Sequence, residues 1–227
     1  AFAVPNLVFH KFQPKEYLRA GIICLAAGSL IGLGIVLLNV CVMHAGIGVL
    51  YVGLAGVLLS VFYPTLKYHA LGDLDIFFDY SILPILGTCY AVTGQFIWPV
   101  LLLAVPVGLI TVAVLHANNT RDIESDREAG IRTFAMLIGG KASYILYIVY
   151  MIVPFVWLAG CIATSQLHWL SGLAFFALVK ALANIRQAAK FPQEGLKAMT
   201  MLDLASSQLQ LMFSLLLSLG LIIGAVV

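Results

Sequence analysis

A dense run of polar side chains, HANNTRDIESDREAG at residues 116–130, interrupts a sequence that is 62% hydrophobic and only 10% charged. If this run is helical, Asn118, Asp122 and Asp126 lie along one face, with Ser125 beside them. Two carboxylates one turn apart repel each other unless a cation lies between them. Their oxygens suit Mg²⁺, which takes one or two carboxylates together with waters and phosphate oxygens. The alternative is a solvated loop between apolar helices, whose charges would need no common face.

The same run carries a family resemblance. It reads N-x-x-x-D-x-x-x-D from Asn118 to Asp126 and continues R-E-A-G, and this pattern resembles the second aspartate-rich motif of the UbiA superfamily of intramembrane aromatic prenyltransferases. Residues 130–139 are similar to the menaquinone-forming branch of that family. The resemblance implies transfer of a geranylgeranyl-type polyprenyl group from its diphosphate to a hydroxylated naphthoquinone precursor, in menaquinone (vitamin K2) biosynthesis. It also implies Mg²⁺ as cofactor, held by Asp122 and Asp126 with Asn118 in support.

A second motif follows the second apolar stretch. Tyr63 and Lys67 are one helical turn apart, so a hydroxyl and an ammonium could face the same anion. A lysine beside tyrosines at a membrane edge is also typical of interfacial anchoring. The pattern Y-x-x-x-K followed by L-G-D, which ends at Asp73, is similar to the superfamily's, where it lies beside the diphosphate.

The resemblance therefore implies roles for several polar residues in these two motifs. The catalytic residues it implies are Asp122, Asp126, Lys67 and Tyr63, and the substrate-binding residues are Asn118, Asn119, Arg121, Arg127 and Tyr68. Within these sets, Lys67, Tyr63 and Arg121 would stabilise the departing pyrophosphate. Three further residues are read from position alone: Asp75 as an interfacial residue, Asp79 as a weaker functional candidate one turn deeper, and His116 as a structural residue at a helix end.

The elements that must position these residues are membrane spans. A mean hydropathy of +1.05 over 227 residues indicates an integral membrane protein. We expect an all-α, polytopic transmembrane helical bundle that forms a single domain over residues 1–227. Seven apolar stretches are long enough to cross the bilayer, near 17–39, 45–63, 75–93, 98–116, 142–163, 167–186 and 205–227. Clustered glycines in the first two stretches predict close helix packing: Gly28, Gly32, Gly34, Gly46, Gly48, Gly53 and Gly56.

The charge distribution gives the topology. With seven spans, every Lys and Arg falls on one side, and the connections near 40–44, 94–97 and 164–166 contain none. Positive-inside sorting then places residues 117–141 and 186–204 in the cytosol. We expect an endoplasmic reticulum or Golgi membrane if the protein is eukaryotic, and the inner membrane if it is bacterial.

The resemblance covers about the last three-quarters of a family member, which has nine spans and two aspartate-rich motifs. Upstream of the first span, only Asn6–His10 begins as the missing N-x-x-x-D motif does, and the first aspartate of the chain is Asp73. We therefore expect a domain that is N-terminally incomplete, without the first two spans and the first motif. Expressed alone, such a chain should form no product.

Several alternatives stay open. The acceptor could be another ring, of the ubiquinone, homogentisate or haem type, and the prenyl length is not fixed. A non-catalytic family member could bind prenyl diphosphate or a sterol, and a small cation or proton carrier could use Asp79, Asp122 and Asp126. The four cysteines form no C-x-x-C pair, so neither a zinc site nor a disulfide framework is indicated. The expected partners are the isoprenoid diphosphate, the aromatic acceptor and membrane lipids, with no nucleic acid.

Overall fold

The computed structural model describes residues 13–227, and among these the regular structure is entirely helical. Seven segments are long and apolar enough to cross a membrane: Lys15–Val42, Gly48–Tyr68, Gly72–Thr93, Trp98–Arg121, Gly140–Ala163, Trp169–Met199 and Leu202–Val226. Each matches one of the seven predicted stretches. The chain is therefore an integral, multi-pass membrane protein built as an all-α bundle, as predicted. The segment Asn6–His10 lies outside the described residues.

The spans are assembled from shorter helical elements. In chain order they are α2 (Pro14–Leu37), the π-helical turn η1 (Leu38–Val42), α3 (Gly48–Tyr68), α4 (Gly72–Phe77), the π-helical turn η2 (Phe78–Ile82), α5 (Leu83–Thr93), the 3₁₀ turn η3 (Trp98–Val100), α6 (Leu101–Arg121), α7 (Ile123–Glu128), α8 (Phe134–Ile138), α9 (Gly140–Ala163), the 3₁₀ segment η4 (Trp169–Ala177), α10 (Leu178–Ala188), α11 (Phe191–Glu194), the 3₁₀ turn η5 (Gly195–Met199) and α12 (Leu202–Val226). Helices satisfy their own backbone polar groups, which a lipid environment requires.

The third span is built from two helices. The π-helical turn η2 separates α4 from α5, and Pro84 stands in the first turn of α5. Because proline lacks an N–H, it is tolerated at a helix start and disrupts a helix interior. A short helix, α4, thus carries Asp73 and Asp75 at the polar end of the span.

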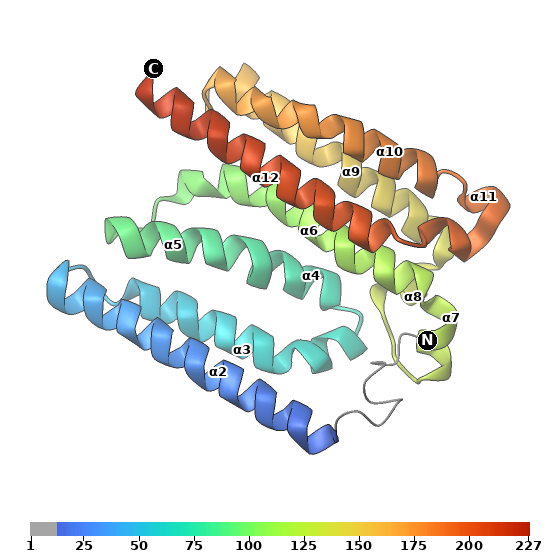
Figure 1. Ribbon diagram of the computed structural model, residues 1–227, viewed down its shortest axis with the longest axis horizontal. Helices are drawn as coiled ribbons and strands as arrows, with labels where there is room; N and C mark the ends of the chain where they lie inside the picture. The colour runs from blue at the N-terminus through green and yellow to red at the C-terminus, as the bar shows by residue number, and fades with distance from the viewer. Residues whose placement is uncertain (1–12) are drawn as a thin grey trace.

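The polar connections gather at one end of the bundle (Figure 1). The turn between α3 and α4, the α7–α8 segment and α11 lie at that end, while the α2–α3 and α5–α6 connections lie at the other. This arrangement brings the polar run at 116–130 and the end of α3 to the same membrane surface, although they are far apart in sequence.

The buried core lies among α6, α9, α12 and η4. Its largest fully buried side chains include Tyr147, Met151, Leu158 and Phe213. The Tyr147 hydroxyl is satisfied by Ser206 Oγ at 2.7 Å. The core thus anchors α6, the helix that ends in the polar run.

Outside this core the first span is lightly packed. A side chain added at Gly28, Gly32 or Gly34 would meet nothing within 4 Å among the described residues, whereas one at Gly48 would collide with Tyr90. The prediction of close packing therefore fails for the glycines of α2 and holds for the start of α3.

The topology can be tested by labelling. Single cysteines at Ser125 and Gln193, in a background without the four native cysteines, should react with an impermeant maleimide from the cytosolic side only, because both lie in the basic connections. A cysteine at Gln95, in the connection at the other end, should react only from the opposite side. Reaction of Ser125 and Gln193 sites from opposite faces would contradict the seven-span arrangement.

Candidate active site

The polar run continues the helical hydrogen bonding of α6 through its end. Asp122 ends α6 and precedes α7, with its backbone N–H donating to the Asn118 carbonyl at 3.0 Å. The Asp126 N–H in turn donates to the Asp122 carbonyl at 2.8 Å. The spacing of one turn between Asn118, Asp122 and Asp126 is thereby kept across the junction, as the sequence predicts.

Arg121 is the cation that lies among these groups. Its Nε donates to Asp122 Oδ1 at 2.8 Å and its Nη2 to Asp122 Oδ2 at 2.9 Å, so one guanidinium occupies both oxygens of that carboxylate. Nη2 also donates to the Asn118 amide oxygen. A two-pronged bond of this kind fixes orientation as well as charge.

A third carboxylate, which the sequence analysis did not single out, completes this cluster. Asp203, at the start of α12, accepts a hydrogen bond from Arg121 Nη1 at 2.7 Å. The available signal was a lone carboxylate at the start of an apolar span, on the same side as the polar run. Arg121 therefore bridges two carboxylates that lie 81 residues apart in sequence.

Lys67 faces this cluster from α3. Burial raises the pKa of the Asp126 carboxyl above its ordinary value, whereas the ammonium of Lys67 and, more weakly, the guanidinium of Arg121 act to lower it. The structure thus joins Asn118, Arg121 and Asp122 by hydrogen bonds, and the charge of Lys67 acts on Asp126. That Lys67 and Asp126 hold one ligand together stays a prediction.

Tyr63 and the aspartates of the third span differ in their surroundings. Tyr63 is half-buried on α3, one turn before Lys67. Asp75 is only 4% exposed, which does not fit the ordinary interfacial residue expected from its position. Asp79 accepts a hydrogen bond from Ser60 Oγ at 2.9 Å, which gives it a packing role between α3 and η2.

Three further residues are predicted to bind substrate: Asn119, Arg127 and Tyr68. Asn119 is 2% exposed, and its side-chain oxygen has no partner among the described residues. Arg127 is exposed on α7, and Tyr68 is half exposed at the last residue of α3. Their contact with substrate stays a prediction.

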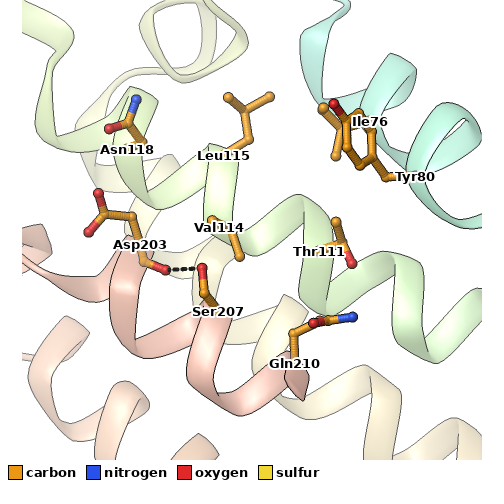
Figure 2. A pocket seen from close by; sticks show the side chains of 9 residues that line it. All are labelled: Ile76, Tyr80, Thr111, Val114, Leu115, Asn118, Asp203, Ser207 and Gln210. Carbon is orange, nitrogen blue, oxygen red and sulfur yellow. Dashed lines mark hydrogen bonds between the residues drawn. The ribbon is translucent and has the colours of Figure 1, made fainter. Parts of the chain in front are cut away.

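A cavity of about 520 Å³ extends from the cluster into the bundle (Figure 2). Asn118 and Asp203 stand at one end and Thr111 and Gln210 at the other, with Ile76 and Tyr80 of the third span opposite. Because Thr111 and Asn118 are seven residues apart on α6, the cavity runs about 10 Å along the helix. Arg121, which bonds to both Asn118 and Asp203, places a positive charge beside this end. That end and the long, mainly apolar wall suit a molecule with an anionic head and a hydrocarbon tail.

The donor set fits a magnesium ion that is shared with a diphosphate. Two carboxylates and one amide leave coordination positions for water and phosphate oxygens, which is how Mg²⁺ is usually bound. Within residues 13–227, no group of three or more His, Cys, Asp or Glu side chains is placed to hold a metal by itself. Arg121 bonds to both oxygens of Asp122, so a metal bound there shares the carboxylate with the guanidinium, through the second lone pair of an oxygen, or displaces it.

A family model described as the UbiA prenyltransferase family matches residues 5–225. The chain belongs to this family. A UbiA prenyltransferase is an intramembrane protein, in agreement with the seven spans. The match covers both the aspartate run and the Y-x-x-x-K motif, so the resemblance seen in these short patterns extends over nearly the whole chain.

Individual relatives agree with this placement in the UbiA family. The chain is 31% identical over 204 residues to UbiA prenyltransferase domain-containing protein 1 of Gallus gallus, an alignment that covers 88% of this chain and 61% of that protein. It is 35% identical over 150 residues to the protein of that name from Mus musculus, covering 66% of this chain and 45% of the relative. A Drosophila melanogaster homolog is 44% identical over 89 residues, 39% of this chain and 25% of that protein. The chain thus spans less than two thirds of the length of these relatives.

Proposed function

We propose that this chain is the catalytic core of an Mg²⁺-dependent aromatic prenyltransferase, formed as a single domain. The observation that carries the proposal is that Arg121 joins Asn118, Asp122 and Asp203 by hydrogen bonds, and that Asn118 and Asp203 line one end of a mainly apolar cavity. Such a site can hold a diphosphate at the membrane surface while its isoprenoid tail lies among the helices. Each buried CH₂ of that tail favours an apolar environment by about 0.8 kcal/mol.

The substrates proposed are a geranylgeranyl-type diphosphate and a hydroxylated naphthoquinone precursor, which would place the reaction in menaquinone biosynthesis. This finer assignment rests on the sequence 130–139 and its similarity to the menaquinone-forming branch. The family itself supports the coarser statement, transfer of a prenyl group to an aromatic acceptor.

In the proposed reaction, each residue of the cluster has a separate task. Mg²⁺, held by Asp122 and Asp126 with Asn118 in support, would neutralise charge on the diphosphate as the allylic C–O bond breaks. Lys67 and Arg121 donate to the departing pyrophosphate, whose negative charge grows in the transition state. Tyr63 offers a hydroxyl from the same face of α3 as Lys67. The aromatic ring carbon then bonds to the allylic carbon within the cavity, where the apolar walls exclude water. That ring carbon then releases the proton, or the carboxyl group as CO₂, that it carried, which restores the aromatic ring.

The assignment of substrate is testable by product analysis. Because this chain alone is expected to form no product, the assay uses a protein that also carries the upstream spans and the first aspartate-rich motif that the resemblance implies. Reconstituted in lipid with Mg²⁺ and geranylgeranyl diphosphate, it should prenylate dihydroxynaphthoate in preference to hydroxybenzoate or homogentisate, measured by chromatography. Preference for another ring would move the protein to a different branch of the family. Binding of the diphosphate without transfer to any ring would favour the non-catalytic alternative.

A further inference from the structure

Apart from the cluster around Arg121, a buried hydrogen-bond network connects four helices at the polar end of the bundle. His116, fully buried on α6, has its Nδ1 2.6 Å from Asp73 Oδ2 on α4 and its Nε2 3.1 Å from the Ser143 carbonyl on α9. The Ser143 hydroxyl donates to the Ala135 carbonyl of α8 at 3.2 Å. The hydrogen-bond network thus links α4, α6, α9 and α8.

The hydrogen bonds of the His116 ring fix its orientation. A carbonyl oxygen only accepts, so Nε2 carries a hydrogen and donates to Ser143. The contact on the other side, with Nδ1 2.6 Å from Oδ2, is a second hydrogen bond of the same ring. Both ring nitrogens are therefore bonded at once, and the imidazole has one allowed orientation.

The position of this pair connects the two halves of the proposed site. Asp73 follows Lys67 by six residues, through the tight turn between α3 and α4. His116 precedes Asn118 by two residues at the end of α6. An ideal Cβ on Gly72 would lie 3.6 Å from both Leu115 and the Lys67 backbone, so the α3–α4 turn lies close to the end of α6.

We infer that Asp73 and His116 are positioning residues that hold the end of α3, with Tyr63 and Lys67, in register with the end of α6, with Asn118 and Asp122. The inference rests on the proposed function for its catalytic consequence. It differs from the sequence-based expectation, in which Asp73 lies beside the diphosphate and His116 is simply structural.

A buried pair such as Asp73 and His116 can fix geometry without adding to the stability of the fold. Buried ionic or polar pairs contribute little net stability, because desolvation offsets their attraction, and apolar residues of similar volume often replace them without loss of stability. Asp73 also lines a cavity of about 340 Å³ with otherwise mainly apolar walls, so a leucine at position 73 has room. A double Asp73→Leu, His116→Leu variant should consequently fold, yet lose the fixed geometry.

The first test measures geometry without turnover. Spin labels on cysteines introduced at His69 and Glu124, both exposed, report the distance between the α3 end and α7 in a background without the native cysteines. Asp73→Ala and the double leucine variant should broaden a narrow distance distribution. Asp73→Asn should keep it narrow, because its amide can donate to Nδ1. Ser81→Ala is the matched control, since Ser81 Oγ donates to the Ala104 carbonyl, another link between the third span and α6, about 18 Å along the helix from His116.

The second test measures catalysis of the same variants in a protein that also carries the upstream spans and the first aspartate-rich motif implied by the resemblance. Asp73→Ala should lower kcat/KM by roughly tenfold to a hundredfold in the folded fraction, because an ångström of misplacement costs about that much. Asp73→Asn should keep kcat/KM within about threefold of the value for the unsubstituted protein. A merely structural role would reduce the yield of folded protein and leave kcat and KM of that fraction unchanged. A narrow distance distribution in Asp73→Ala overturns the inference, whereas absence of prenyl transfer in every protein, with the distance changes present, overturns only the proposed function.

Discussion

Replacing Asp122 or Asp126 with asparagine should lower kcat/KM for prenyl transfer by about 10³-fold, because each change removes a charge that the diphosphate–metal complex needs. The substitution keeps the shape of the side chain and the helical backbone bonds at 118–126. Asp126→Asn should in addition abolish Mg²⁺-dependent binding of a non-reacting diphosphate analogue, measured by calorimetry.

Glu124→Gln is the matched control for these substitutions. Glu124 is an exposed carboxylate on α7, between the two aspartates in sequence, and it makes the same change from acid to amide. It should keep activity within about twofold. Analogue binding that is unchanged by both aspartate substitutions and by EDTA would contradict a metal site on this face.

The spans could be predicted from sequence because each one is a local property. A helix in lipid satisfies its own backbone, so about 20 apolar residues in succession are sufficient evidence for it. The helical register of Asn118, Asp122 and Asp126 was predictable for the same reason. The glycines of α2 show the limit of this approach: their spacing indicates a packing surface, but it does not say which neighbour, if any, covers that surface.

The unpredicted parts of the site depend on which helices meet. Asp203 joins Arg121 only because α12 packs beside α6, and Asp73 reaches His116 only because α4 does. In sequence, Asp203 is one carboxylate at the start of an apolar span and His116 one histidine at the end of another. Contacts of this kind, between side chains 43 and 82 positions apart, leave no periodic signal.

Arg121→Met should lower kcat/KM by roughly 10²-fold to 10³-fold, which is the cost expected for one oriented donor to a developing charge. The loss should exceed that of Asp203→Asn, because Arg121 contacts Asn118, Asp122 and Asp203 together, whereas Asp203 acts through Arg121. Arg132→Met, at an exposed arginine beyond α7, serves as the control for loss of a positive charge near the membrane surface.

A double variant that combines Arg121→Met with Asp203→Asn distinguishes two roles for Arg121. In the structure its guanidinium bonds to both oxygens of Asp122, so its positive charge opposes Mg²⁺ binding at that carboxylate, and Asp203 holds the same guanidinium through Nη1. If Asp203 draws Arg121 away as the metal binds, Asp203→Asn should raise the Mg²⁺ concentration needed for analogue binding, and this effect should vanish when Arg121 is already methionine. A double-mutant cycle of the binding midpoints measures that coupling. Additive midpoints would show that Arg121 and Asp203 act independently, and full activity of Arg121→Met would reduce Arg121 to a counter-ion for the two aspartates.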